Sequence, residues 1–372
     1  MKVLYVIDTL ETGGAEQSLL AISSRLTRST AVVCHVYRGA ALKQKFEAAN
    51  VPVISLDLAG GYNFFEAYKK LKNICRSEKP DLIVSALYRS EIISRFVARS
   101  MNIPQIGSFV SDSYSENKKA TFSSLGRLKF KFFYWLNRIT ANYSAAYVAN
   151  SESIKQSNSR ALGVPPEKIH VIYRGRQVSE ISRAPSLRDE IRFLNVGRLI
   201  RGKGQKELIH AFSRFIKVRP ESTLTIAGEG PFRTELEADV QKLELMNSVK
   251  LLGNVENVSA LYQRHDCLVF PSHYEGFSGV LVEAMLSKLP VLASDIPMNL
   301  EAITHLNTGY IFEVKNEDAI LEAMNWFAVN REAATEIANR AFADASSRFD
   351  IQAIVQQHED LYQAIVTNAK RR

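Results

Sequence analysis

Two glutamates lie eight positions apart on either side of a glycine-rich turn in the stretch HYEGFSGVLVEAML, residues 273–286. The turn from Gly276 to Gly279 precedes an apolar pattern that predicts a helix, and the free N–H groups of a helix's first turn attract phosphate. Glu283, on the second turn of that helix, carries a carboxylate that suits a ribose diol. Glu275 lies before the turn, where it could contact whatever is attached to the far end of a diphosphate. The stretch therefore predicts a nucleotide site bracketed by two acids.

Two cations stand among three glycines in GRLIRGKG, residues 197–204. A departing diphosphate gains negative charge in the transition state, and the side chains of Arg198 and Lys203 could stabilise that charge without a metal. No Asp-x-Asp pair follows a predicted strand. We therefore expect no metal site, no obligatory divalent ion and no other cofactor.

Three further positions have both a chemical and a purely structural interpretation. Gly228, in GEGP, could contact the nucleotide or only form a turn. Gly14, in TGGAE, opens a predicted helix whose N–H groups could reach the same phosphates, or it forms a tight turn between strand and helix. Arg89 could meet a phosphate of an acceptor, or it pairs with Glu91 or another acid.

Strand and helix patterns alternate along the chain, and this order places the candidate residues just after strands. The apolar runs are VLYVI (3–7), AVVCHV (31–36), DLIVSAL (81–87) and AAYVAN (145–150), followed after the polar stretch 179–190 by RFLNVG (192–197), TLTIAG (223–228), VKLLG (249–253), CLVF (267–270) and PVLAS (290–294). This βαβα order predicts parallel sheets in two doubly wound domains. Such domains bind ligands at the carboxyl ends of their strands.

Length, composition and charge limit the class of protein. A chain of 372 residues with 46% hydrophobic composition is expected to form two globular domains. No apolar run approaches the ~20 residues of a membrane-spanning helix, the apolar start ends at Asp8, and three scattered cysteines favour a reducing cytoplasm. Residues 1–185 carry 26 Lys and Arg against 14 Asp and Glu, whereas residues 186–372 carry 21 against 25. The basic first half favours an anionic partner.

The chain resembles the family 4 glycosyltransferases, retaining enzymes of the GT-B fold that use nucleotide sugars. The resemblance covers nearly the whole chain and rests on GGAE (13–16), ANSESIKQ (149–156), GVPPEKIHVI (163–172), NVGRLIRGKG (195–204), AGEGP (227–231) and YEGFSGVLVEAMLSKLPVLASD (274–295). It implies an α/β architecture of two doubly wound Rossmann-like domains that face one another across a cleft. Residues 1–178, joined by a C-terminal helix at 351–368, would bind the acceptor, and residues 187–350 would bind the nucleotide sugar.

The resemblance also implies roles for individual residues. In the E-x7-E element of the family the first acid contacts the donor sugar and the second the ribose, which correspond to Glu275 and Glu283. The Arg and Lys of the family's GR-x4-KG element bind the donor diphosphate and correspond to Arg198 and Lys203. The complete set expected to bind the donor is Gly14, Arg198, Lys203, Gly228, Gly276, Phe277, Ser278 and Glu283.

One departure from the family concerns a histidine that many relatives place just after the strand corresponding to PQIGSF, residues 104–109. This chain has VSDSYSEN there, with Ser111 and Asp112 near the position of that histidine. A front-face displacement lets the leaving phosphate oxygen take the acceptor proton, so the reaction needs no separate base. Asp112 remains a candidate orienting group beside Glu275 at the reaction centre.

Basic and aromatic residues alternate in GRLKFKFFYWLNRIT, residues 126–140. On a helix this mixture suits the interface of an anionic membrane, and the alternative is a core-packed helix with a solvated basic edge. Nucleic acid is not expected as a partner, because the sequence has no helix-turn-helix, RNA-binding aromatic sheet or zinc spacing.

The sequence thus predicts a cytoplasmic, metal-independent, retaining hexosyltransferase that can associate peripherally with the cytoplasmic face of a membrane. The donor would be a nucleotide-diphosphate sugar, by family frequency a UDP-sugar. The acceptor would be a hydroxyl of a saccharide or lipid-linked saccharide in polysaccharide, lipopolysaccharide or glycolipid biosynthesis. The alternatives are another GT-B enzyme, such as a nucleotide-sugar epimerase or a phosphorylase, and a non-catalytic donor-binding partner of a glycan-assembly complex.

Overall fold

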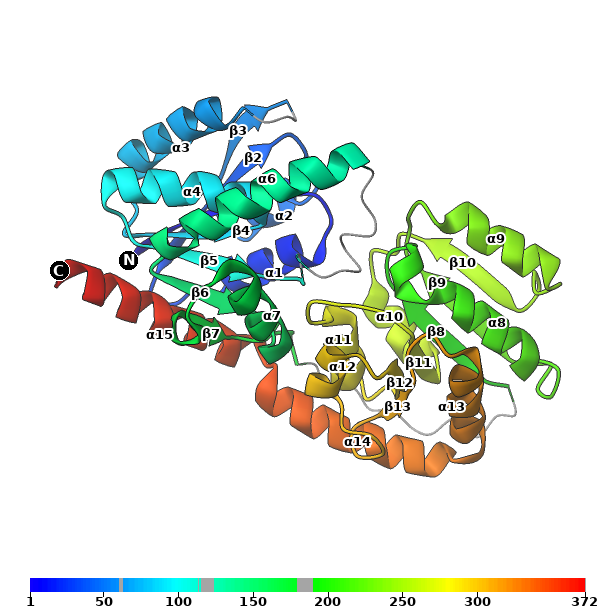
Figure 1. Ribbon diagram of the computed structural model, residues 1–372. Coiled ribbons are helices and arrows are strands. Elements are labelled where there is room, and N and C mark those ends of the chain that lie inside the picture. Colours follow the sequence, from blue (N-terminus) through cyan, green and yellow to red (C-terminus); the bar gives the residue numbers. More distant parts are fainter. Residues whose placement is uncertain (60–62, 113, 115–123, 179–189, 372) are drawn as a thin grey trace. The chain divides into compact units, whose positions relative to one another are not determined.

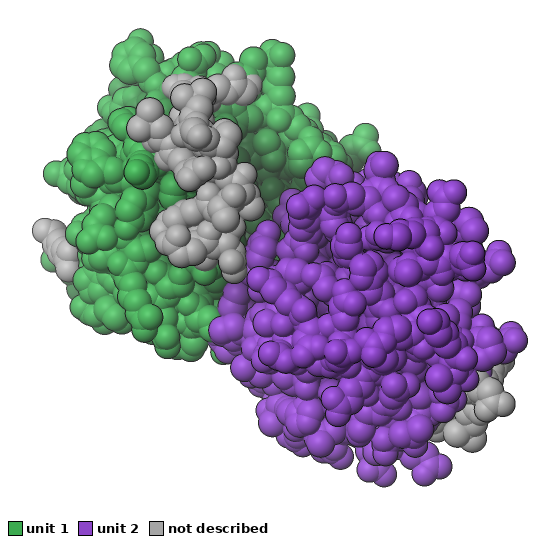
Figure 2. Space-filling model, turned by 45° about the vertical axis from the view of Figure 1, so that its right-hand side comes forward, with its two compact units in different colours: residues 1–175, 351–372 green, residues 176–350 purple. Residues whose placement is uncertain are grey.

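The computed structural model describes residues 1–59, 63–112, 114, 124–178 and 190–371, and in the helix that begins at Ser124 it describes side chains from Phe130 onward. These residues form two compact units, each built on one parallel sheet (Figure 1). Unit 1 comprises Met1–Gly175 and Ile351–Arg372, and unit 2 comprises Arg176–Asp350 (Figure 2). The last helix of the chain therefore belongs to the same unit as the first strand.

The sheet of unit 1 has seven strands in the order β3-β2-β1-β4-β5-β6-β7. All neighbouring strands are parallel. The strands are β1 (Lys2–Ile7), β2 (Thr30–Tyr37), β3 (Val53–Leu58), β4 (Leu82–Ala86), β5 (Gln105–Phe109), β6 (Ala146–Ala149) and β7 (Ile169–Val171). The run predicted at 3–7 is buried throughout, as expected for a central parallel strand that is covered on both faces.

Helices cover both faces of this sheet. They are α1 (Gly14–Ser23), α2 (Lys43–Ala48), α3 (Phe64–Glu78), α4 (Tyr88–Met101), α6 (Ser124–Thr140), α7 (Glu152–Leu162) and α15 (Ile351–Lys370), with the 3-10 turns η1 (Ala141–Tyr143) and η2 (Pro166–Lys168). The helices α3 and α4 pack on one face through residues such as Leu71 and Val97. The helices α1, α2 and α15 pack on the other face through Leu19, Phe46 and Tyr362.

The sheet of unit 2 has six strands in the order β10-β9-β8-β11-β12-β13, and its neighbouring strands are also parallel. The strands are β8 (Arg192–Val196), β9 (Thr223–Ala227), β10 (Val249–Gly253), β11 (Cys267–Phe270), β12 (Val291–Ser294) and β13 (Tyr310–Phe312). The helices are α8 (Gln205–Phe215), α9 (Arg233–Lys242), α10 (Val258–Arg264), α11 (Gly279–Leu286), α12 (Pro297–Ala302), α13 (Glu317–Val329) and α14 (Arg331–Arg348), with the 3-10 turn η3 (Arg201–Lys203). The helices α8, α9 and α13 share one core with the sheet, which includes Phe193, Phe212 and Phe327.

In both sheets the strand order reverses beside the first strand of the unit, between β1 and β4 in unit 1 and between β8 and β11 in unit 2. Ligands of doubly wound folds bind outside the carboxyl ends of the strands at this switch point. The loop carrying Gly14 follows β1, and Arg89 follows β4. Arg198 and Lys203 follow β8, and Glu275 follows β11. The predicted pair of doubly wound parallel sheets is confirmed.

Candidate active site

The loops after β8 and β11 lie against each other at the switch point of unit 2. The strands pair side by side, with Leu268 opposite Leu194, so their carboxyl ends lie next to one another. The ammonium of Lys203 forms an ion pair and hydrogen bond with Oε1 of Glu275. Both side chains are mostly buried, which strengthens their attraction relative to that of an exposed pair. The structure thus brings together Lys203, which is predicted to bind the diphosphate, and Glu275, which is predicted to bind the sugar.

Glycines make this close approach possible. A Cβ atom at Gly202 would lie 2.3 Å from the ring of Tyr274, and one at Gly204 would lie 2.2 Å from the carbonyl oxygen of Pro271. Gly204 also has a positive φ of 69°, which other residues rarely adopt. The backbone N–H of His273 donates to the carbonyl of Gly202 at 2.9 Å. The GKG segment is therefore shaped to pack on the stretch that precedes Glu275.

Arg198 is exposed at the end of β8. Its backbone carbonyl accepts a hydrogen bond from the Gln205 side chain at 3.1 Å, which fixes the backbone but leaves the guanidinium to solvent. Among the described residues no ion pair of Arg198 is found. This side chain is available for an anionic ligand.

The structure gives Gly228 a packing role. Its φ is +142°, and a Cβ atom there would lie 1.9 Å from the carbonyl oxygen of Gly197. Gly197 in turn donates its N–H to Ala227 at 2.9 Å. Gly228 therefore lets the loop after β9 lie directly on the loop that carries Arg198. This packing explains why a glycine occupies the position, whether or not it contacts a ligand.

The turn before α11 is held from within unit 2. The Phe277 side chain is 1% exposed and packs against Phe349 with ring centroids 5.3 Å apart. Ser278 is the N-cap of α11, and its hydroxyl accepts from Leu281 N–H at 3.4 Å. Phe277 and Ser278 therefore offer a ligand their backbone rather than their side chains, and Gly276 is the part-exposed residue of the turn.

Glu283 has partners on both carboxylate oxygens. Arg176 donates from Nε to Oε1 at 2.6 Å, and the Tyr262 hydroxyl donates to Oε2 at 2.9 Å. Burial and the adjacent Glu283 carboxylate raise the pKa of Tyr262 well above its usual value, so the hydroxyl stays protonated and can donate. Sequence reasoning missed both partners. The one feature of the sequence that could have indicated Arg176 is YRGRQ, residues 173–177, where two arginines flank a glycine just after β7.

In unit 1 the residue at the start of α1 is Gly14. A Cβ atom there would lie 2.8 Å from Nη1 of Arg174, so this guanidinium rests against the first turn of the helix. Gly13 is the N-cap, and the carboxylate of Glu16 folds back to within 2.3 Å of where a Cβ of Gly13 would lie. The two glycines therefore make room for charged side chains.

Arg89 and Asp112 lie after β4 and β5 in the same unit. The guanidinium of Arg89 lies over the ring of Tyr37, with its central carbon 5.1 Å from the ring centroid. Asp112 accepts a hydrogen bond from the hydroxyl of Ser157 in α7 at 2.5 Å. The stretch VSDSYSEN continues beyond the described residues, so the surroundings of Asp112 are described only on the side of α7.

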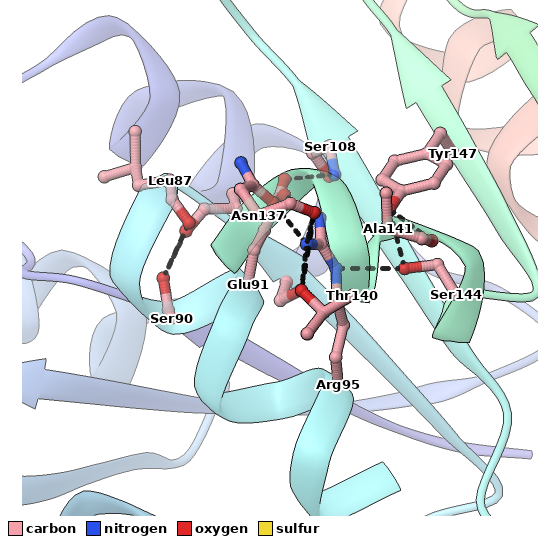
Figure 3. Close-up of polar contacts among 12 residues, drawn as sticks. Leu87, Ser90, Glu91, Arg95, Ser108, Asn137, Thr140, Ala141, Ser144 and Tyr147 are labelled. Carbon is pink, nitrogen blue, oxygen red and sulfur yellow. Dashed lines mark hydrogen bonds and ion pairs between the residues drawn. The ribbon is translucent and has the colours of Figure 1, made fainter. Parts of the chain in front are cut away.

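A buried polar network joins α4 to α6 (Figure 3). Arg95 is fully buried and donates from Nη2 to Glu91 at 2.7 Å, from Nη1 to Thr140 at 3.2 Å, and from Nε to Ser144 at 3.3 Å. The other oxygen of Glu91 accepts from the backbone N–H of Ser108 in β5 at 3.0 Å. Burial raises the pKa of Glu91 to about 7. The network fixes which face of α6 packs against α4 in the interior of unit 1.

The opposite face of α6 exposes apolar and basic side chains. Phe132 is 56% exposed and Trp135 55% exposed, and Lys131, Arg138 and Ile139 are exposed on the same helix. The spacing of these positions puts them on one side of the helix. The buried Phe133 fits the interpretation of a core-packed helix, but the opposite edge of the helix exposes the aromatic rings of Phe132 and Trp135 as well as basic side chains.

This exposed face of α6 continues onto α3 and α4. Phe65 in α3 and Phe96 in α4 are also exposed, and the buried ring of Phe133 stacks on Phe64 with centroids 5.7 Å apart. A groove of about 730 Å³ between the three helices has Arg99 among its lining residues. From the sequence, α3 has four Lys and Arg, α4 three and α6 four, against three glutamates in all. We call this region the aromatic-basic surface.

The described residues contain neither a membrane-spanning helix nor a metal-binding cluster. No helix in the described ranges is long and apolar enough to cross a bilayer. No group of three or more His, Cys, Asp or Glu side chains in the described part of the chain is arranged to hold a metal ion.

Two family models match successive parts of the chain that overlap at residues 178–180. The model described as Glycosyltransferase Family 4 matches residues 12–180, and the model described as Glycosyl transferases group 1 matches residues 178–344. An uncharacterized glycosyltransferase of Methanocaldococcus jannaschii is 27% identical over 61% of this chain and 58% of its own length. The chain thus matches about three fifths of the length of the first curated relatives.

A second curated protein and a solved structure are also similar to this chain. The Campylobacter jejuni protein named GalNAc-alpha-(1->4)-GalNAc-alpha-(1->3)-diNAcBac-PP-undecaprenol alpha-1,4-N-acetyl-D-galactosaminyltransferase is 27% identical, over 77% of each chain. The Anabaena protein HepE, solved with UDP and with UDP-glucose, superposes with a TM-score of 0.84 at 23% identity, over 98% of this chain and 100% of HepE. At that identity the likeness to HepE shows the shared fold.

Proposed function

Because the chain belongs to the family 4 glycosyltransferases and has their GT-B fold of two Rossmann-like domains, we propose that it transfers a hexosyl unit from a nucleotide-diphosphate sugar to an acceptor hydroxyl, with retention of configuration. Unit 2 binds the donor and unit 1 the acceptor. The observation that carries the proposal is the ion pair of Lys203 with Glu275 at the switch point of unit 2, where doubly wound folds bind ligands and where the loop after β8 also carries the exposed Arg198.

The chemistry follows from the charges at this point. Lys203 exchanges its ion pair with Glu275 for a contact with the donor diphosphate, and Arg198 adds a second cation. Together they stabilise the charge that develops on the leaving diphosphate, in place of a metal. The freed carboxylate of Glu275 then accepts hydrogen bonds from the donor sugar. The leaving phosphate oxygen takes the acceptor proton on the same face of the sugar, which gives retention without a separate base.

The favoured donor is a UDP-sugar. HepE, which has the same fold, was solved with UDP and with UDP-glucose. Glu283 recognises the ribose of the donor, a part shared by all ribonucleotides, and therefore does not select the base.

The favoured acceptor is a lipid-linked saccharide in polysaccharide, lipopolysaccharide or glycolipid biosynthesis, at the anionic cytoplasmic face of a membrane. Two observations support this. The aromatic-basic surface of unit 1 combines exposed aromatic rings with an excess of cations, which suits an anionic lipid interface. The name of the Campylobacter relative describes a diphospho-undecaprenol-linked substrate.

A thermal-shift panel of nucleoside diphosphates and nucleotide sugars tests the donor site. A ligand at 100 times its dissociation constant stabilises the folded protein by about 2.7 kcal/mol, so the correct base raises the melting temperature most. Stabilisation by none of these compounds would overturn the proposal. Transfer assays with the identified donor, with and without EDTA, then test turnover and metal independence. Donor binding without any transfer or hydrolysis would instead indicate a non-catalytic partner.

A further inference from the structure

Arg176 holds the carboxylate of Glu283 although the two residues are 107 positions apart. The guanidinium is largely buried, with the Arg176 side chain 15% exposed and that of Glu283 29% exposed. The backbone of Arg176 is fixed as well, because its N–H donates to the carbonyl of Phe349 at 2.8 Å and it forms a bridge with Asp350. The arginine is therefore held at both its backbone and its side chain.

Gly279 makes room for this guanidinium. A Cβ atom at Gly279, the first residue of α11, would lie 2.0 Å from Nη2 of Arg176. The φ of Gly279 is outside the positive range in which glycine is favoured. Lack of space for a side chain therefore explains why a glycine occupies this position, and a special backbone conformation does not. A cation at the first turn of a helix opposes the helix dipole. The arrangement therefore depends on the compensating charge of Glu283.

Two acceptor positions of Glu283 remain. An ionised carboxylate offers about four lone-pair positions, and Arg176 and Tyr262 each use one, on different oxygens. A ribose diol supplies two O–H donors, which matches what is left. Because both oxygens are already held, the carboxylate cannot rotate freely before a ligand arrives, and this lowers the entropic cost of binding.

We propose that Arg176 is a positioning residue for donor recognition, which together with Tyr262 fixes Glu283 so that its remaining acceptor positions meet the 2′ and 3′ hydroxyls of the donor ribose. This inference rests on the ribose role of Glu283 in the proposed function. The opposite possibility is that Arg176 blocks Glu283 and must be displaced by the ribose. The two arrangements predict changes of opposite sign when the arginine is removed.

Calorimetric titration of the full chain with UDP and 2′-deoxy-UDP, and with GDP and 2′-deoxy-GDP, distinguishes a positioning role of Arg176 from a blocking role. We expect Arg176→Gln to weaken binding of the preferred ribonucleotide about tenfold, the scale of one charge-assisted hydrogen bond. Binding of its 2′-deoxy counterpart should change much less, and Arg176→Lys should recover part of the loss. The matched control is Arg214→Gln, which removes an arginine–carboxylate pair between α8 and α13 in the same unit.

Gly279→Ala provides a second test that keeps both charges. The added methyl group displaces the guanidinium of Arg176 from its contact with Glu283, while alanine favours the helix. The preference for the ribonucleotide should therefore fall as in Arg176→Gln, and the protein should stay folded. In transfer assays both variants should raise KM for the donor and leave kcat nearly unchanged.

The outcomes are distinct. Unchanged ribonucleotide affinity in Arg176→Gln and Gly279→Ala would overturn the role of Arg176 alone, and tighter binding would show that the arginine blocks the site. If the unmodified protein bound none of the nucleoside diphosphates and nucleotide sugars of the thermal-shift panel, the proposed function would fail and this role would fail with it.

Discussion

Lys203 and Glu275 form an ion pair at the carboxyl ends of β8 and β11, and 72 positions of sequence separate them. The pairing neutralises the cation that would bind a diphosphate and the acid that would bind a sugar. Each side chain is thereby held near the position where the donor would need it. A donor that separates the pair supplies a new partner to each member, so the exchange leaves neither charge uncompensated.

Arg198→Ala should weaken binding of the donor nucleotide. The exposed guanidinium is available for an anionic ligand, and a hydrogen bond to a charged group contributes about 1.5–3 kcal/mol. We expect a loss of roughly tenfold or more in calorimetric affinity. Arg214→Ala, which removes an exposed arginine at the end of α8, serves as the control. Equal affinity of Arg198→Ala and the unmodified protein would remove Arg198 from the site.

Glu275→Gln and Glu283→Gln should have different kinetic effects. If Glu275 contacts the sugar as it becomes positively charged, loss of its charge mainly lowers kcat. Contacts of Glu283 with the ribose are alike in the ground and transition states, so its loss mainly raises KM for the donor. Steady-state kinetics, with folding checked by thermal melts, compare the two. A Glu275→Gln variant with near-normal kcat would show that Glu275 only shapes the turn and anchors Lys203.

The aromatic-basic surface should bind anionic vesicles. The chain has two tryptophans, so Trp326→Phe leaves Trp135 as the only one and makes its fluorescence a direct probe. We expect a blue shift with vesicles that contain phosphatidylglycerol, and a weaker response with phosphatidylcholine alone. Raising the salt concentration should weaken binding, because the screening length is about 10 Å at 0.1 M.

A paired set of variants localises this contact. Phe65→Ser combined with Phe132→Ser removes two exposed rings from the surface, and it should reduce vesicle binding. Val218→Ser combined with Val329→Ser removes two exposed apolar side chains of unit 2 and serves as the control. Equal losses in both double variants, or no vesicle binding at low salt, would contradict the assignment.

His358 should make the stability of the protein depend on pH. Burial lowers the pKa of this histidine from 6.5 to about 4, so between these values the unfolded chain binds a proton that the folded chain does not. Stability from this residue is therefore fully present above pH 6.5 and falls as the pH drops toward 4, by on the order of 3 kcal/mol. His358→Gln should flatten the fall in melting temperature between pH 6.5 and 4.5, and the exposed His305→Gln should not. Identical curves for the three proteins would rule out this role.

Local pattern in the sequence determined most of the fold. Apolar runs such as 192–197 and 267–270 predicted parallel strands, and the positions of Arg198, Lys203 and Glu275 just after them implied that these residues meet at one edge of a sheet. The reason is that the carboxyl ends of parallel strands lie along the same edge. The strands β7 and β13, of three residues each, were missed because so short a run has no measurable period. The six-residue strand β3 was missed as well, because Ser55 and Asp57 interrupt its apolar run.

Tertiary structure alone decided the partners of the predicted site residues. Nothing in the sequence around Glu283 indicates that Arg176 and Tyr262 hold its two oxygens, and nothing around Phe277 shows that its ring is buried against Phe349. Residue type and spacing report on neighbours within a few positions. A contact across 107 positions depends on how two loops are brought together by the sheet that carries them, and only the packed fold sets that distance.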